Sequence, residues 1–295
     1  MSYFAFLAVF LGIPLAILSG ITLIDFKRGK WLPDALYSWK AWVVILGLCI
    51  VAFIYTTPWD NYLVATNVWW YDINLVTGIV IGYVPIEEYT FFVVQPIMTG
   101  LFTILLMRYL PLNPIKANNA RIRIISTVIV AVIWIASVIA LILSKTNPDY
   151  QEFTYLGLEL SWALIPVIIQ LAFGADILWR HARIVLPAIL ISTFYLSAAD
   201  MLAIAEGTWV IDPAQSLPIY MAGILPIEEF IFFLLTNTLV VLGLTLVLAE
   251  ESQTRAETLE KYALTRPVGL WLKRINSMNT KTSNRKTHEH LAIPG

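Results

Sequence analysis

Nearly the same eight residues occur twice in this chain: Pro-Ile-Glu-Glu-Tyr-Thr-Phe-Phe at 85–92 and Pro-Ile-Glu-Glu-Phe-Ile-Phe-Phe at 226–233. The offset between the copies is 141, and Gly82 matches Gly223 at the same offset. A second block recurs at an offset of 140, in which Asp60, Trp69 and Asp72 match Asp200, Trp209 and Asp212. One inserted residue between the blocks reconciles the two offsets. The chain therefore contains an internal repeat.

The composition is that of a membrane protein. Of the 295 residues, 59% are hydrophobic and 13% are charged, and the mean hydropathy is +0.75. A soluble domain is about half apolar and about a quarter charged, so the composition argues against a soluble enzyme and a disordered chain. The net charge of −1 gives nucleic-acid binding no electrostatic support. A single cysteine, Cys49, excludes a disulfide within the chain, and the three histidines offer no multi-histidine metal site in the membrane.

Seven apolar stretches are long enough, or nearly so, to cross a bilayer, which needs about 20 residues. They predict an all-α polytopic membrane protein. The stretches are 3–24, 40–57, 76–107, 122–143, 154–176, 184–204 and 217–248. The third and the seventh are longer than one span requires, and each contains a proline (Pro85, Pro226) that predicts a break or a kink.

Charges in the loops alternate along the chain. Basic residues follow spans one, three, five and seven, whereas the opposite loops are mainly acidic. By the positive-inside rule we expect a multi-pass protein of the cell membrane with its N-terminus outside and its C-terminus cytoplasmic. No Lys or Arg precedes the first span, so no cleavable signal peptide is predicted. The tail after Ala249 is predicted to begin as a helix and to be disordered beyond Asn276.

The repeated unit comprises three spans, and the fourth span links the two units. Because span five lies four crossings after span one, both units have the same orientation, and a pseudo-two-fold axis along the membrane normal relates them. The predicted divisions are a first repeat at 1–110, a linking helix at 111–150, a second repeat at 151–248 and a polar tail at 249–295. The two acidic motifs can then face each other across one cavity, while the position of span four inside or outside the ring stays open.

Four glutamates, Glu87, Glu88, Glu228 and Glu229, are predicted about ten residues inside long apolar runs. An acidic side chain near the bilayer centre costs about 2.5–3.5 kcal/mol, so a functional interior site is favoured over an inert, wet position at the interface. Burial favours the neutral form of a carboxyl group, and two neighbouring carboxyls share a proton. The motifs thus predict an acid–base pair that needs no metal or cofactor.

Neighbouring residues on a helix point about 100° apart, so each pair directs one carboxyl into the cavity. Gln95 and Thr236 each follow the second glutamate of a pair by two turns, which favours Glu88 and Glu229 for the inner face. Asp60 and Asp200 are candidates to hydrogen-bond or tune the central acids.

Aromatic residues cluster around the acids. Packing is their commoner role, but each ring face can also stabilise a cation by about 0.5–2 kcal/mol. The candidates for substrate contact are Tyr83, Tyr89, Phe91, Phe92, Phe230, Phe232 and Phe233.

Several other residues carry more ordinary expectations. Tryptophans 59, 69, 70 and 209 fit an interfacial aromatic belt. Glu159 is expected near the outer interface, and His181 is expected in an exposed loop. Asp25 and Asp176 are expected to be solvated or paired with basic residues.

Two three-span units, each with Pro-x-Glu-Glu and a following Phe-Phe, resemble the integral-membrane lycopene β-cyclase family over residues 1–248. The resemblance implies an isomerase whose substrate is lycopene or a similar linear C40 carotenoid, surrounded by membrane lipid, with ψ-end groups cyclised to β-rings as in γ- and β-carotene. It implies that both motifs, Glu87, Glu88, Glu228 and Glu229, are required and that no flavin is used. The chain has no GxGxxG fingerprint. Oligomeric state is not predicted.

Three other functions share the seven spans or the buried acids of this sequence. A rhodopsin needs a lysine in its last span, and 217–248 contains none. A proton-coupled transporter also uses buried acids but more often has inverted repeats and polar, broken helices. A related carotenoid hydratase, in which water captures the same cation, is poorly separated by sequence.

Overall fold

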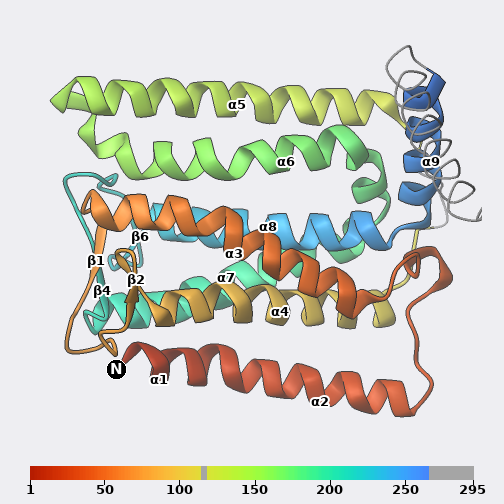
Figure 1. The fold of residues 1–295 in the computed structure, drawn as a ribbon, viewed down its shortest axis with the longest axis horizontal. Coiled ribbons are helices and arrows are strands. Elements are labelled where there is room, and N and C mark those ends of the chain that lie inside the picture. The colour runs from red at the N-terminus through yellow and green to blue at the C-terminus, as the bar shows by residue number, and fades with distance from the viewer. Residues whose placement is uncertain (114–117, 266–295) are drawn as a thin grey trace, which may run out of the picture. The chain divides into compact units, whose positions relative to one another are not determined.

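Seven membrane-length apolar helices form within the residues that the structure, a computed structural model, describes, namely 1–113 and 118–265 (Figure 1). This confirms the all-α polytopic fold. The first span joins α1, the π-helix η1 and α2, and the other six are α3 to α8. Their bounds are Tyr3–Leu7, Ala8–Gly12 and Ile13–Lys27, then Ala41–Ala65, Ile86–Tyr109, Ala120–Thr146, Thr154–Arg180, Ala182–Ala205 and Ile227–Leu248.

The two long apolar runs are broken at their prolines, as predicted. Helices α4 and α8 begin directly after Pro85 and Pro226, whose backbones are extended. A proline lacks the amide hydrogen and disfavours a helical residue before it, so the helix cannot extend further toward the N-terminus. The residues before each proline instead form a hairpin, β2 (Val80–Ile81) with β3 (Val84–Pro85), and β5 (Tyr220–Met221) with β6 (Leu225–Pro226).

The inserted residue that separates the two repeat offsets lies in these hairpins. The β2–β3 turn has Gly82 and Tyr83 between its paired ends, whereas the β5–β6 turn also accommodates a third residue. Gly82 and Gly223 both have left-handed backbones, with φ of +69° and +74°. At Gly82 a Cβ atom would also collide with the side-chain oxygen of Asn61, so this turn requires glycine.

The six repeat helices obey the predicted pseudo-two-fold symmetry. Contacts of α3 with α4, α2 with α4 and α3 with α8 are matched by contacts of α7 with α8, α6 with α8 and α7 with α4. Helices α4 and α8 meet on the axis. Strand β1 (Trp69–Tyr71) from the first repeat pairs antiparallel with β4 (Trp209–Ile211) from the second. Figure 1 shows all of these strands at the same end of the helices.

The linking helix α5 lies outside this arrangement and packs along α6. Its apolar window is the least buried of the seven. The open question about span four is therefore answered, because α5 does not close the ring.

Charged residues at the other end of the helices are paired as expected. Arg108 donates to Asp25 (3.3 Å) and Arg123 to Asp176 (2.8 Å). The expectation for His181 is wrong: it is 1% exposed at the joint between α6 and α7. Burial, reinforced by the positive charge of Arg180, lowers the pKa of His181 to about 4.

The second unit of the chain begins at Glu251. Helix α9 (Glu250–Thr265) confirms that the tail starts as a helix. The predicted disorder beyond Asn276, and His288 and His290, lie outside the described residues.

Candidate active site

The four glutamates lie in the first turns of α4 and α8, so the expectation that they sit deep within long spans is corrected. Their exposed fractions are nevertheless only 1% for Glu87, 9% for Glu88, 0% for Glu228 and 7% for Glu229. The reason is that the hairpins and the loops carrying β1 and β4 lie at the same end of the helices. The four glutamates are thus buried although they lie at the ends of their helices.

The first glutamate of each pair holds the adjacent loop. Glu87 Oε1 accepts the backbone N–H of Thr77 (2.7 Å), and Glu228 Oε1 accepts that of Leu217 (2.7 Å). A buried backbone N–H group needs a hydrogen-bond acceptor. These two carboxyls therefore hold the loop that precedes the hairpin of their own repeat and covers the site.

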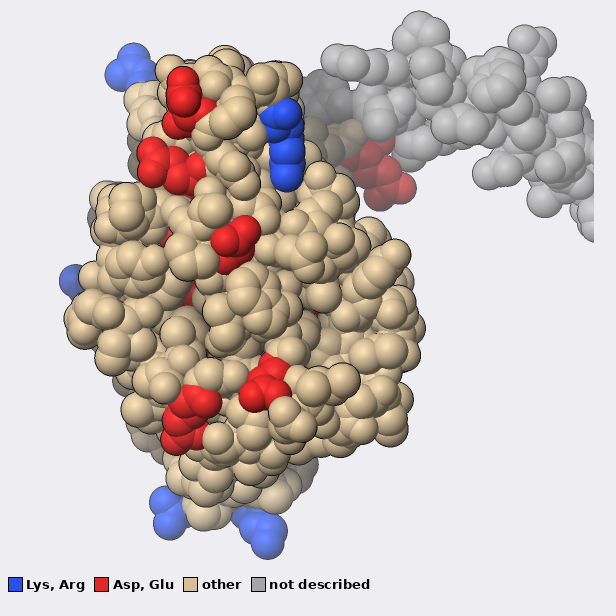
Figure 2. All heavy atoms as spheres, turned by 90° about the vertical axis from the view of Figure 1, so that its left-hand side faces the viewer, with Lys and Arg blue, Asp and Glu red and all other residues tan. Residues whose placement is uncertain are grey.

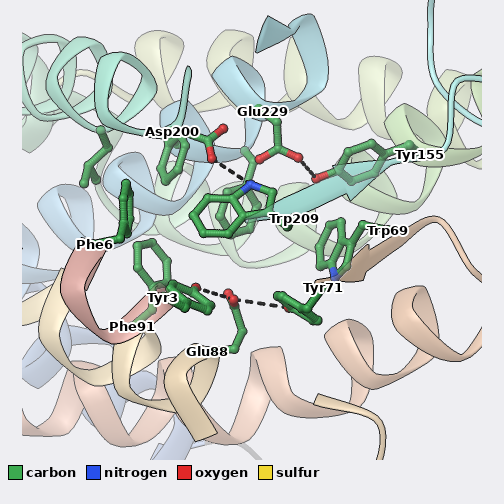
Figure 3. Close-up of a pocket in the computed structure, with 13 residues that line it drawn as sticks. Tyr3, Phe6, Trp69, Tyr71, Glu88, Phe91, Tyr155, Asp200, Trp209 and Glu229 are labelled. Atoms are coloured by element: carbon green, nitrogen blue, oxygen red, sulfur yellow. Dashed lines mark hydrogen bonds between the residues drawn. The ribbon is translucent and has the colours of Figure 1, made fainter. Parts of the chain in front are cut away.

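The second glutamate of each pair faces inward. Glu88 and Glu229 line the same cavity, which encloses about 540 Å³ of empty space (Figure 3). Glu88 Oε2 accepts hydrogen bonds from the hydroxyls of Tyr3 and Tyr71, the latter at 3.2 Å. Glu229 Oε1 accepts one from Tyr155 (2.7 Å). One acid from each repeat is thus presented to a shared space.

Tyr71 lies in β1, in the segment of chain that connects α3 to α4. Desolvation, together with the nearby carboxylates of Asp60 and Glu88, raises the pKa of its phenol well above the usual value. Tyr71 therefore stays a neutral hydrogen-bond donor to Glu88.

Tyr3 and Tyr155 are symmetry counterparts that sequence reasoning missed. Each lies at the start of the first helix of its repeat, and its backbone N–H donates to the covering loop, Tyr3 to Leu75 O (2.8 Å) and Tyr155 to Gln215 O (2.9 Å). The two tyrosines are 152 positions apart, so they do not align at the 140 or 141 offset of the motifs. The signal that could have found them is a tyrosine at the start of both spans one and five.

The remaining cavity walls are mostly aromatic. Phe91, Phe232 and Phe233 line it, as expected. Residues from outside the motifs join them: Phe6, Trp69, Tyr71, Leu196 and Trp209.

The other four predicted aromatics lie elsewhere. Tyr83 is 65% exposed on the hairpin turn. Tyr89 donates its hydroxyl to Ile81 O (2.8 Å) and so holds the hairpin instead. Phe230 packs on Phe194 on another face of α8, and Phe92 lines a neighbouring groove. The sequence could not separate these faces because aromatics surround the whole first turn.

The interfacial-belt assignment is wrong for Trp69 and Trp209. Trp69 and Trp209 line the cavity, and Trp59 stacks on Trp162 with ring centroids 4.4 Å apart. Trp70 is 41% exposed. The paired strands β1 and β4 place Trp69 and Trp209 in the cavity wall, so their position near a span end does not imply contact with lipid headgroups.

Of the four polar residues predicted to support the acids, only Asp200 lines the cavity. Asp200 lines the cavity and accepts a hydrogen bond from Trp209 Nε1 (2.9 Å), and Asp60 is equally buried on α3. Gln95 donates to Asn237 Oδ1 (2.8 Å) between α4 and α8, away from the glutamates. Thr236 donates to Phe232 O of its own helix (2.9 Å).

Glu159 is fully buried on α6 instead of lying at the interface, and its carboxyl oxygens have no hydrogen-bond partner among the described residues. Within those residues no cluster of three or more His, Cys, Asp or Glu side chains is arranged to hold a metal ion.

Comparison with known proteins gives a consistent group of relatives. The chain is 36% identical over 248 residues to a protein named lycopene beta-cyclase from Halobacterium salinarum, covering 83% of this chain and 95% of that protein. It is 37% identical over 196 residues to a bifunctional lycopene cyclase/phytoene synthase from Phycomyces blakesleeanus, covering 66% of this chain and 32% of that protein. No family model and no solved structure matches the chain.

Proposed function

This chain belongs to the lycopene β-cyclase family, and we propose that it cyclises the ψ-end groups of a linear C40 carotenoid to β-rings. The observation that carries the proposal is that Glu88 and Glu229, one from each repeat, line a single buried and largely aromatic cavity. Cyclisation of a polyene end needs a proton donor, a proton acceptor and walls without a strong nucleophile. No described residue and no relative favours the transporter or the hydratase.

The reaction proceeds by moving one proton. A neutral carboxyl group delivers H⁺ to C2 of the terminal C1=C2 double bond, which leaves a tertiary cation at C1. The C5=C6 double bond attacks C1, forming the C1–C6 bond and moving the cation to C5. A carboxylate then removes the proton from C6, and the C5=C6 double bond of the β-ring forms. Since no electron is gained or lost overall, the enzyme is an intramolecular lyase, and no step requires a redox cofactor.

The unequal hydrogen bonding supports different roles for the two acids. Hydrogen bonds donated by neutral groups stabilise the charge of a carboxylate. Glu88 accepts two from tyrosine hydroxyls, whereas Glu229 accepts one from a tyrosine hydroxyl and forms its other side-chain hydrogen bond with the acidic side chain of Asp200. We therefore assign the base to Glu88 and the acid to Glu229. Glu87 and Glu228 are positioning residues, because they hold the covering loops through backbone N–H groups.

The aromatic walls stabilise the cationic intermediates. Phe91, Phe232 and Trp209 present rings to the cavity, and each ring face contributes about 0.5–2 kcal/mol to a nearby cation. The rings offer no lone pair that would trap the cation covalently.

The proposed orientation in the cell membrane places the strand-bearing end outside and the C-terminus in the cytoplasm. Figure 2 shows this end, where several Asp and Glu side chains lie on a mostly uncharged surface. The opposite loops carry most of the basic residues, as the positive-inside rule requires.

A lycopene-accumulating host that expresses the chain tests the function. Its membranes should form γ- and β-carotene without added flavin or nicotinamide, and incubation of isolated membranes with unlabelled lycopene in D₂O should place one deuterium in each new ring. Unchanged lycopene despite normal levels of the protein in the membrane would refute the function. Cyclised product without deuterium would refute protonation as the first step.

A further inference from the structure

Two apolar grooves run along the helices on either side of the symmetry axis. The α3–α6 groove has walls from α3, α4, α6 and α8 and includes Val51, Tyr55, Phe91, Trp162 and Phe232. The α2–α7 groove has walls from α2, α4 and α7 and includes Pro14, Met98, Ile191 and Tyr195.

The grooves are symmetry counterparts. Tyr55 and Tyr195 are 140 positions apart, as are Val51 and Ile191, and each pair places one member in each groove. The tyrosines make matching hydrogen bonds to the first helix of the other repeat. Tyr55 donates to Trp162 O (2.9 Å) and Tyr195 to Phe10 O (2.8 Å).

Only one groove shares walls with the cavity that contains the acids. Phe91 and Phe232 line both that cavity and the α3–α6 groove, whereas none of the residues lining the α2–α7 groove lines the cavity. The empty space is about 790 Å³ in the α3–α6 groove and about 670 Å³ in the α2–α7 groove. The two grooves therefore differ less in volume than in the residues that they share with the cavity.

We propose that the α3–α6 groove binds the polyene chain of the carotenoid whose end group occupies the cavity. This inference rests on the proposed function and adds a binding site for the unreacted part of the substrate. From Phe232 to Val240 the groove follows α8 away from the cavity for eight residues, or about 12 Å at 1.5 Å per residue. That length holds part of a C40 chain, and the rest extends into the bilayer.

The chemistry of the groove walls suits a flat, apolar ligand. Aromatic rings from Phe92, Trp162 and Phe232 flank it, and they can stack on a conjugated chain. Tyr55 donates its hydroxyl within the protein, so it places no free donor toward the ligand.

Val51→Trp and Ile191→Trp form a matched pair that tests the groove. Both positions are exposed on the helix surface, at 62% and 53%, so neither substitution overfills the core. We expect Val51→Trp to slow conversion of lycopene about tenfold, the effect of about 1.4 kcal/mol in transition-state binding. Ile191→Trp should stay within about twofold of the original chain, and Val51→Phe serves as a second blocking variant should Val51→Trp be poorly inserted.

A binding readout separates the groove from catalysis. In purified Glu88→Gln/Glu229→Gln protein, lycopene held in the asymmetric groove should show induced circular dichroism in its visible band. Adding Val51→Trp should abolish that signal, and adding Ile191→Trp should preserve it. Equal loss in both variants, equal retention in both, or no signal at all (a groove filled by lipid alone) would overturn the inference. If the original chain fails to cyclise lycopene but the signal obeys the expected pattern, the proposed function fails and the binding groove stands.

Discussion

In the first repeat Glu88 accepts hydrogen bonds from Tyr3 and Tyr71, whereas in the second repeat Glu229 accepts one from Tyr155. The cause is a single substitution in the covering strands, because Ile211 stands at the repeat position of Tyr71. The scaffold is therefore symmetric while the surroundings of its two acids are not. Such a difference allows two identical side chains to take different roles in one reaction.

Glu159 adds a second difference. It is fully buried one turn after Tyr155, whereas Leu7 is its counterpart one turn after Tyr3. The second repeat therefore has one buried carboxyl, that of Glu159, without a counterpart in the first repeat. The two halves differ most where they surround the cavity, as expected if their equivalence at the site was lost after the scaffold was duplicated.

The largest effect is expected for the inner acids. Glu88→Gln and Glu229→Gln should each lower cyclisation by about 10²–10⁴-fold, the usual contribution of a general acid or base. Pigment analysis of membranes matched for protein level measures the loss, and Asp149→Asn at the same end is the control. Should either single variant keep the original rate, that repeat does not supply an acid or base.

The outer acids should matter less and in the same way in both repeats. Glu87→Ala and Glu228→Ala each leave a backbone N–H group without its acceptor, at a cost of about 1–3 kcal/mol, so activity should fall about tenfold. The matching Gln variants retain an acceptor and should recover most of the activity. A glutamine no better than alanine would show that the carboxyl itself reacts instead of holding a loop.

Tyr71→Phe should make the first repeat resemble the second. It removes one hydroxyl donor from Glu88, a loss of about 1 kcal/mol or about fivefold in kcat with KM unchanged. Tyr83→Phe, on the exposed hairpin turn, is the matched control. Equal rates for Tyr71→Phe and the original chain would remove the basis for assigning the base to Glu88.

The smallest effect on activity is expected at His181 in the link between α6 and α7, because the corresponding link between α2 and α3 contains no histidine. The folded pKa of about 4 lies below the unfolded value of about 6.5, so the stabilising contribution of neutral His181 is complete above pH 6.5 and is lost as pH falls toward 4. At pH 5 the loss is about 2 kcal/mol. The original chain should lose more thermal stability between pH 7 and pH 5 than His181→Gln, and parallel curves would contradict the assignment.

Much of the fold follows from hydropathy and repetition, because membrane spans and duplicated motifs leave long signals in the sequence. The break at Pro85 was also predictable, since proline acts locally. The depth of the glutamates was not, because Val80, Ile81 and Val84 count as membrane residues by hydropathy although they form a hairpin. A hairpin pairs its backbone groups within itself, so apolar side chains alone do not identify a helix.

The site was predictable only in part. A spacing of two turns between Glu88 and Gln95 favoured the glutamate that does line the cavity, although Gln95 itself binds Asn237 instead. Trp69 and Trp209 reach the cavity through strand pairing between distant segments, a contact that no local pattern encodes.

The antiparallel ladder between β1 and β4 takes one strand from each half of the chain. When only the first half of the chain has been synthesised, β1 therefore has no partner strand. The cover above Glu88 is then incomplete. Activity therefore requires the second half of the chain, because it supplies both Glu229 and the strand β4 that pairs with β1. The same dependence would couple two separately encoded halves, since neither could act before finding the other.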